Sequence, residues 1–114
     1  MTDERIELPH HRLDAYRLAL EVLRIVRAAE IRDAKLRDQA MRAAKSAALN
    51  VAEANGRTSP ADRARVFAIA RGEAMEAAAA LEIATLAGDA HPESYEACLP
   101  LAHRLFCVLT KLCR

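Results

Sequence analysis

Apolar residues recur at three- and four-residue spacing in four stretches of this chain, which are separated by short polar links. The pattern predicts helices over residues 13–30, 33–55, 60–87 and 92–112. Residues 1–12 precede the first helix and are predicted to form a loose arm, because Pro9 prevents an earlier helix start. Four helices with short links favour a single domain over residues 1–114, an antiparallel up-down-up-down four-helix bundle.

Capping residues mark the ends of the predicted helices. Ser59 suits the N-cap of the third helix and Pro60 its first position, while Gly88 is expected to end it. The Asn-Gly pair that finishes at Gly56 is expected to end the second helix, because both residues tolerate the left-handed conformation of a C-cap. Pro100 lies inside the fourth helix and is expected to kink it.

Two features of the apolar pattern indicate contacts beyond a minimal bundle. The first helix has one polar stripe and is apolar elsewhere, whereas a helix in an isolated bundle needs only about three apolar positions in seven. Part of this helix is therefore expected to contact another subunit. Gly72 in the third helix costs about 1 kcal/mol of helix propensity. A close neighbouring backbone is the expected compensation, so Gly72→Leu is predicted to disrupt folding or assembly.

Composition supports an all-α fold. Alanine, leucine, arginine and glutamate dominate the 114 residues, whereas 3 glycines, 4 prolines and 4% aromatic residues are too few for a sandwich or barrel. No apolar leader follows the charged N-terminus and no stretch is apolar enough to cross a membrane. Three cysteines without a CxxC motif are typical of a reduced, cytoplasmic protein.

Charge is unevenly distributed along the chain although its net value is only +1. Residues 31–71 contain nine basic and four acidic residues, a net charge of +5, whereas residues 72–114 have a net charge of −3. The basic set is Arg32, Lys35, Arg37, Arg42, Lys45, Arg57, Arg63, Arg65 and Arg71. This set is either a phosphate-binding face or a solvated face whose helix pairs with an acidic one.

Polar residues between the second and third helices have structural alternatives to a site. Glu53, Glu73 and Glu76 lack the Glu-x-x-His spacing of di-iron bundles, so salt bridges are the favoured interpretation. The expected partners are Arg42, Arg57 and Arg71. Asn50 falls on or beside the apolar stripe and is interpreted as a register-setting or partly exposed amide rather than a ligand contact.

No motif predicts catalysis. Cys98 shares a face with apolar residues and is expected in the core, while Cys107 lies four residues after His103 on the opposite face. That pair lacks an orienting acid and a glycine loop, and the chain has no P-loop, dinucleotide fingerprint or nucleophile elbow. We therefore expect no enzyme, no catalytic residue, no cofactor and no metal site.

The run RAAKS at residues 42–46, followed by NVAEANGR at residues 50–57, resembles a known family pattern. The next helix supplies the matching aromatic, Ile-Ala pair, glycine and glutamate at Phe67, Ile69, Ala70, Gly72 and Glu76. The chain is similar to the small four-helix-bundle proteins encoded in intervening sequences of bacterial large-subunit ribosomal RNA genes. The accessory variability determinant of diversity-generating retroelements belongs to the same superfamily. The sequence departs from the pattern at Ala54, where glycine is usual, and at Glu73, where serine is usual.

The resemblance implies a cytosolic four-helix bundle that forms a homopentameric ring and binds nucleic acid through a basic surface. In the retroelement branch it also implies partnership with a reverse transcriptase. The favoured hypothesis is a non-enzymatic adaptor that binds RNA or DNA non-specifically through phosphate contacts. The residues expected to make those contacts are Arg42, Lys45, Arg57 and Arg63. The alternative is a protein-interaction scaffold that docks a partner chain on apolar helix faces and has no nucleic-acid role.

Overall fold

Four helices make up most of the computed structural model, which describes residues 6–114. A short 3-10 turn, η1 (Pro9–Arg12), is followed by α1 (Asp14–Ala28), α2 (Ala34–Asn55), α3 (Pro60–Leu86) and α4 (Pro92–Leu112). The described part contains no strand, so the prediction of an all-α chain with four helices is confirmed. Every helix begins and ends within two residues of its predicted bounds. Over residues 6–114, no helix combines the length and apolar character that a bilayer crossing requires.

The segment before α1 differs from the loose arm that was predicted. Residues 1–5 of that arm lie outside the described residues. Residues Pro9–Arg12 form a 3-10 turn, in which Nδ1 of His11 accepts a hydrogen bond from the backbone N–H of Leu8 at 2.9 Å. The rings of His10 and His11 lie edge-on to Tyr16 of α1, with centroids 4.7 and 5.8 Å away. These contacts fold the end of the arm against the start of α1.

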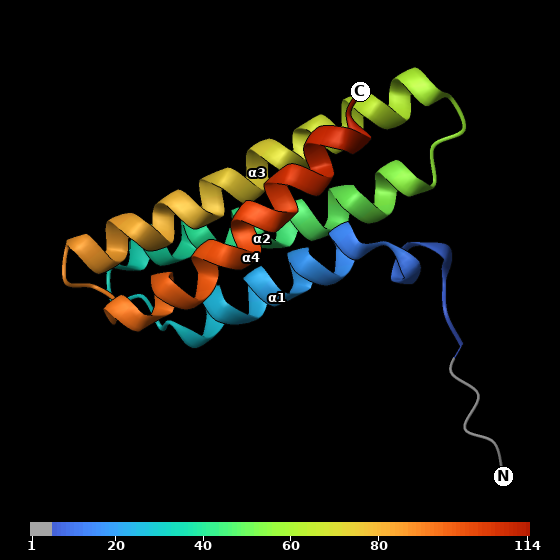
Figure 1. Cartoon of the computed structure of the whole chain (residues 1–114). Coiled ribbons are helices and arrows are strands. Elements are labelled where there is room, and N and C mark those ends of the chain that lie inside the picture. The colour runs from blue at the N-terminus through green and yellow to red at the C-terminus, as the bar shows by residue number, and fades with distance from the viewer. Residues whose placement is uncertain (1–5) are drawn as a thin grey trace, which may run out of the picture.

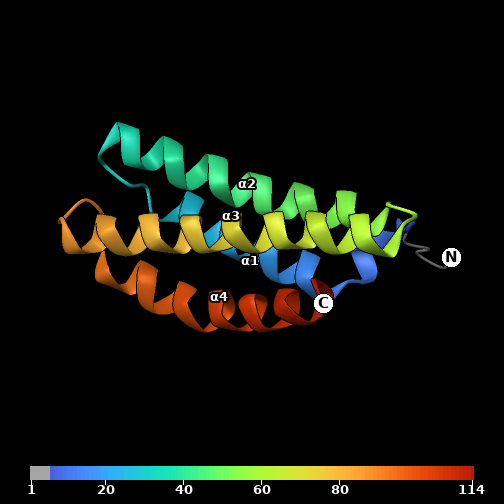
Figure 2. The same ribbon diagram turned by 90° about the horizontal axis from the view of Figure 1, so that it is seen from above.

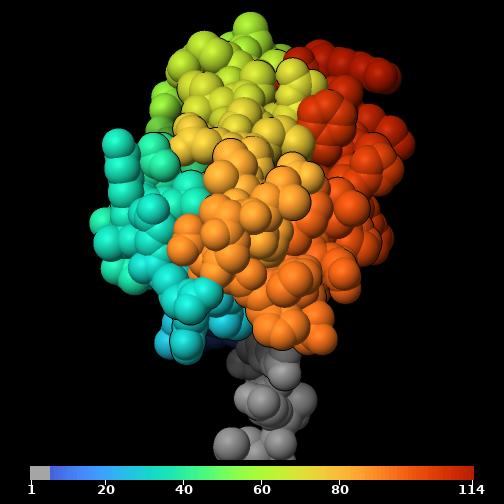
Figure 3. All heavy atoms as spheres, turned by 90° about the vertical axis from the view of Figure 1, so that its left-hand side faces the viewer, coloured from blue at the N-terminus to red at the C-terminus, as the bar shows by residue number. Residues whose placement is uncertain are grey.

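Each helix packs against the next one in the chain, and α1 also packs against α4 (Figures 1 and 2). The contact between α2 and α3 is the most extensive. The α1–α2 and α3–α4 links lie at one end of the molecule and the α2–α3 link lies at the other (Figure 1). A hydrogen bond of 2.9 Å from the backbone N–H of Arg32 to the carbonyl oxygen of Asp89 joins the α1–α2 link to the α3–α4 link. Figure 3 shows this end, where the two links form one continuous surface.

Alanine lines the contact between α2 and α3. The buried alanines of these two helices are Ala40, Ala43, Ala44, Ala47, Ala48 and Ala54 of α2 and Ala70, Ala74, Ala77, Ala80 and Ala84 of α3. Small side chains allow two helix backbones to approach closely, which accounts for the extent of this contact. Larger side chains fill the rest of the core, including Val22 from α1 and Leu105 and Leu109 from α4. Helical spacing in the sequence predicts a core stripe on α2 that comprises Leu36, Ala40, Ala43, Ala47, Val51 and Ala54. All of these residues are buried except Leu36, which is half-buried at the start of the helix.

The caps of α3 form as predicted, and α2 ends at the predicted residue but without the predicted left-handed cap. The hydroxyl of Ser59 accepts a hydrogen bond from the backbone N–H of Asp62, and Pro60 begins α3. Gly88 has a φ of +80°, the left-handed conformation that follows a helix C-cap. Gly56 has a φ of −86° and is right-handed, so the predicted left-handed cap there is wrong. The other positive φ among the described residues belongs to Glu30, at 46°, just after α1.

Pro100, which was expected to kink α4, lies inside the helix without interrupting it. Its ring removes one backbone donor from the helix. The helix continues past it to Leu112. In Figure 2 the axis of α4 curves along its length.

The expected role of Gly72 within the chain is wrong. Gly72 is exposed on α3, and a Cβ placed there would meet no atom within 4 Å. No neighbouring backbone in the described structure therefore requires a glycine, and Gly72→Leu is not expected to disrupt folding. The predicted effect on assembly stays a prediction.

We expect Gly72→Ala and Gly88→Ala to change stability in opposite directions. Gly72→Ala should raise the free energy of unfolding by about 0.5–1 kcal/mol, because alanine has the higher helix propensity and space is open. Gly88→Ala should lower it by about 1–2 kcal/mol, because a Cβ is strained at positive φ although it would meet no atom. Urea unfolding followed by circular dichroism measures both effects. Changes of the same sign would contradict this account.

Candidate nucleic-acid interface

The four cations predicted to contact phosphate lie in two pairs. Arg42 and Lys45 project from the exposed face of α2, where both line a shallow depression of about 430 Å³. Arg57 lies in the α2–α3 link and Arg63 in the first turn of α3. Asn55, the last residue of α2, lies about 15 Å along the helix from Lys45 and about 20 Å from Arg42, and this distance separates the two pairs. The structure therefore does not bring the four predicted residues into one cluster.

Arg42 is engaged by carboxylates of the neighbouring helix. Its Nη1 lies 3.4 Å from Oε2 of Glu73, and its Nη2 forms a second ion pair with Glu76. These contacts cross from α2 to α3. Two carboxylates oppose one guanidinium here, so Arg42 adds no net positive charge to this surface.

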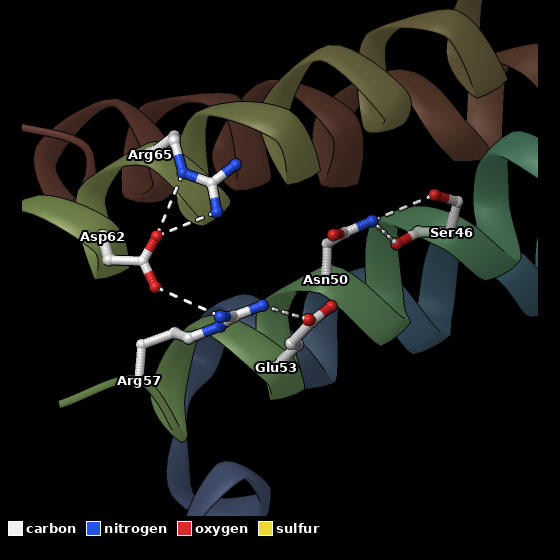
Figure 4. A network of polar contacts seen from close by, with 6 residues as sticks. All are labelled: Ser46, Asn50, Glu53, Arg57, Asp62 and Arg65. Atoms are coloured by element: carbon white, nitrogen blue, oxygen red, sulfur yellow. Dashed lines mark hydrogen bonds and ion pairs between the residues drawn. The ribbon is translucent and has the colours of Figure 1, made fainter. Parts of the chain in front are cut away.

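Arg57 belongs to a polar network that spans the α2–α3 link (Figure 4). It pairs with Glu53 of α2, and its Nη1 lies 3.2 Å from Oδ2 of Asp62 in α3. Oδ1 of Asp62 accepts hydrogen bonds from Nη2 of Arg65 at 2.8 Å and from its Nε at 3.0 Å. The hydrogen bonds from Arg65 and the charges of both arginines hold the pKa of Asp62 below its usual value. The network fixes the link, and carboxylates offset the charge of Arg57.

Lys45 and Arg63 differ from the two paired arginines. Both side chains are exposed, and neither forms a salt bridge within residues 6–114. Exposed cations without a carboxylate partner are the ones that contribute fully to attraction of phosphate. Of the four residues predicted to contact phosphate, Lys45 and Arg63 are the two whose positive charge no carboxylate offsets.

The predicted salt bridges of the three glutamates are largely confirmed. Glu53 pairs with Arg57, and Glu73 and Glu76 pair with Arg42. Arg71, also expected as a partner, instead donates to Oγ1 of Thr110 at 3.2 Å and lies over the ring of Phe106, 5.5 Å from its centroid. Arg71 thus joins α3 to α4 rather than to α2.

Asn50 makes its contacts within α2. Its Nδ2 donates to the carbonyl oxygen of Ser46 at 2.8 Å and lies 3.0 Å from Oγ of Ser46 (Figure 4). The side chain is half-buried. Its amide nitrogen already has partners on the preceding turn, which supports the partly exposed amide of the sequence interpretation over a ligand contact.

A third group of cations was not recognised as a group from the sequence. Arg27, Arg32 and Arg37 line one cavity beside the α1–α2 link. Arg27 belongs to residues 1–30, which have a net charge of −1. A turn whose geometry the sequence does not predict separates Arg27 from Arg32 and Arg37. Their regular five-residue spacing is the sole sequence signal, and it carries meaning only once the link is known to fold back.

The cysteines lie in two environments. Cys98 is fully buried, as predicted, and burial raises the pKa of its thiol to about 11. Cys107 is exposed, with its Sγ 3.8 Å from Nε2 of His103. In residues 6–114 no group of three or more His, Cys, Asp or Glu side chains gathers closely enough to hold a metal ion.

We expect iodoacetamide at pH 8 to modify Cys107 in the folded protein and to spare Cys98. The thiolate is the reactive form, and a pKa of about 11 together with full burial leaves Cys98 protonated and inaccessible. Peptide mass spectrometry after timed alkylation measures both rates, and urea-unfolded protein is the control in which both react. Equal rates in the folded protein would contradict the burial of Cys98.

Comparison with known families gives a match over nearly the whole chain. A model of the 23S rRNA-intervening sequence protein family matches residues 12–111. The chain belongs to the 23S rRNA-intervening sequence protein family. The match extends from the end of η1 almost to the end of α4, which confirms the resemblance to the intervening sequence family that residues 42–76 carry. A search of curated proteins finds no match for this intervening sequence protein.

Proposed function

We propose that this 23S rRNA-intervening sequence protein is a non-enzymatic adaptor that binds RNA or DNA through phosphate contacts. In this proposal it is an antiparallel four-helix bundle that assembles into a homopentameric ring in the cytoplasm. The ring acts as an accessory to a nucleic-acid enzyme such as a reverse transcriptase. The observation that carries the proposal is the pair of exposed cations without salt bridges, Lys45 and Arg63, in a family associated with an rRNA intervening sequence.

Assembly is supported by apolar side chains that the bundle leaves exposed. The large ones in the helices are Leu49, Ile69, Ile83, Leu86, Leu99 and Phe106, of which all but the first lie on α3 or α4. A groove of about 320 Å³ between α3 and α4 is lined by Met75, Leu99 and Phe106 among others. The apolar arc of α1 is instead buried or half-buried in the bundle. The proposed contact between copies therefore lies on α3 and α4 rather than on α1, where the sequence pattern placed it.

Ring formation would strengthen weak phosphate binding. A head-to-tail contact repeats the same surface in every copy around the ring. Two unpaired cations on one copy make a weak site, but the same cations on several copies contact one nucleic acid together. Linked weak contacts of this kind give avidity without any new interaction.

The test combines the solution mass with a binding measurement. Light scattering at micromolar concentration gives the mass, and the ratio of absorbance at 260 and 280 nm reports bound nucleic acid in untreated protein. Gel shifts at low salt with structured RNA and with duplex DNA then test binding. A particle of 12.5 kDa would overturn assembly. Absence of a shift with both nucleic acids would overturn the binding role.

A protein-interaction scaffold remains the second candidate because of the α3–α4 groove. Its apolar lining suits a helix of a partner chain as well as a second copy. Purification from the native host distinguishes the two functions. A stoichiometric protein partner without nucleic acid would favour the scaffold, and bound nucleic acid would favour the adaptor.

A further inference from the structure

A cavity of about 520 Å³ lies beside the α1–α2 link, at the end of the bundle shown in Figure 3. Three arginines line it, one from the last turn of α1, one from the link and one from the first turn of α2. They are Arg27, Arg32 and Arg37. Val26 and Met41 give the cavity an apolar wall. Neither Lys45 nor Arg63, the two cations that carry the proposed function, lines this cavity.

The link brings these arginines together by a sharp reversal of the chain. Glu30 takes a positive φ of 46°, and Ile31, only 1% exposed, anchors the turn in the core. The backbone of Arg32 is fixed to Asp89 by the 2.9 Å hydrogen bond between the links. The position of the cavity is thus set by buried and hydrogen-bonded backbone rather than by a free loop.

No carboxylate forms a salt bridge with the arginines of this cavity within residues 6–114. The guanidinium of Arg32 donates to the carbonyl oxygen of Gly88, and Nη1 of Arg37 donates to that of Ile31 at 3.3 Å. Carbonyl oxygens orient a guanidinium without neutralising it. Arg27 forms no salt bridge or side-chain hydrogen bond within residues 6–114.

The residues that line the cavity have a net positive charge. Glu30 also lines the cavity, which leaves two net positive charges on the lining. Asp33 and Asp89 lie in the two links but do not line the cavity. Oδ1 of Asp33 instead caps α2, where it accepts a hydrogen bond from the backbone N–H of Leu36 at 3.1 Å. Asp38 lines the separate depression that contains Arg42 and Lys45.

We propose that this cavity is an anion site that binds the phosphate group of a nucleotide. The planar guanidinium group of arginine donates two parallel hydrogen bonds to phosphate oxygens. Three guanidinium groups on one concave surface therefore favour an anion with several hydrogen-bond acceptors. The volume lies within the range of small-molecule sites and exceeds what a lone phosphate needs, so the half-buried Met41 of the apolar wall would contact the sugar or base. The assignment of the phosphate to a nucleic acid rests on the proposed function. The anion site itself does not depend on that function.

The first arm of the test uses small probes. Arginine Nε–H resonances are followed by NMR during titration with inorganic phosphate and with adenosine 5′-monophosphate. We expect saturable shifts at Arg27 and Arg37, with the nucleotide binding more tightly than phosphate. The double variant Arg27→Gln/Arg37→Gln should weaken binding at least tenfold by calorimetry. The single variant Arg27→Gln, which removes no intramolecular hydrogen bond, guards against a folding defect.

A matched control removes the same charge elsewhere. Arg104 and Lys111 are exposed on α4 and form no salt bridge within residues 6–114. Arg104→Gln/Lys111→Gln should leave nucleotide binding unchanged. Equal losses in both double variants, or shifts without saturation, would show a general charge effect and overturn the site.

The second arm measures RNA affinity by fluorescence anisotropy. A tenfold or greater loss in Arg27→Gln/Arg37→Gln, with the control unchanged, assigns the phosphate to a nucleic-acid backbone. Nucleotide binding with unchanged RNA affinity assigns it to a free nucleotide. If the wild-type protein binds nucleotide in the cavity but no RNA, the proposed function fails and the site stands. If it binds RNA but no nucleotide, and the cavity variant binds RNA normally, the site fails and the proposed function stands.

Discussion

Leu105→Ala is expected to lower the free energy of unfolding by about 2–5 kcal/mol, the largest stability loss we predict for a single substitution in this protein. Leu105 is fully buried on α4, a helix that packs against both α3 and α1. Much of the core is alanine, so few large side chains are available to move into the space. The free energy lost with the removed apolar atoms and the cost of the unfilled cavity therefore both lower the free energy of unfolding.

The matched control for this prediction is Leu49→Ala. It makes the same change on α2, where Leu49 is 69% exposed, and should alter stability by no more than about 0.5 kcal/mol. Both variants are compared with the wild type by urea unfolding at one fixed protein concentration, because assembly would add a concentration-dependent contribution. Similar losses for both leucines would contradict the burial pattern of α4.

The helices were predictable because their signals are local. Apolar spacing and the Ser59-Pro60 start placed α3, and Gly88 placed its end, without knowledge of any tertiary contact. The alanine stripe of α2 was predictable for the same reason. The small side chains repeat at helical spacing, and helical spacing puts them on one face.

The failures concern geometry that local patterns do not encode. Gly56 and Gly72 are glycines whose neighbours make no use of a missing side chain, whereas Glu30 takes the positive φ that a glycine would favour. Residue type alone does not distinguish these cases, because the backbone path of a link depends on how the helices on either side pack. The buried Ile31 fixes that path after α1.

The candidate site shows the same division between local and distant information. Charge counts located a basic segment, but they did not show that Arg42 meets Glu73 and Glu76, which lie 31 and 34 residues further along the chain. The sequence likewise did not predict that Arg27 and Arg37 line one cavity, because their proximity depends on how the link places α1 against α2. A charge is available to a ligand only after its intramolecular partners are known.

The charge-matched variants Lys45→Gln/Arg63→Gln and Arg42→Gln/Arg57→Gln are expected to differ sharply in RNA binding. Each removes two positive charges from the chain. Lys45 and Arg63 have no salt bridge in the described part, so their loss removes phosphate contacts, each contributing about 0.7–0.9 to the slope of log affinity against log salt. At 0.1 M salt, two such contacts correspond to roughly a ten- to hundred-fold loss of affinity for each copy that contacts the RNA.

The second variant removes cations that already face carboxylates, and we expect the salt slope to stay near that of the wild type. Its cost should be a small loss of stability, because exposed ion pairs contribute only about 0–1 kcal/mol each. Fluorescence anisotropy of one labelled RNA duplex from 50 to 300 mM salt measures both slopes, with unfolding curves as a check on folding. If Arg42→Gln/Arg57→Gln lowers the slope as much as Lys45→Gln/Arg63→Gln, the ion pairs must open to bind phosphate, and the distinction between paired and unpaired cations fails.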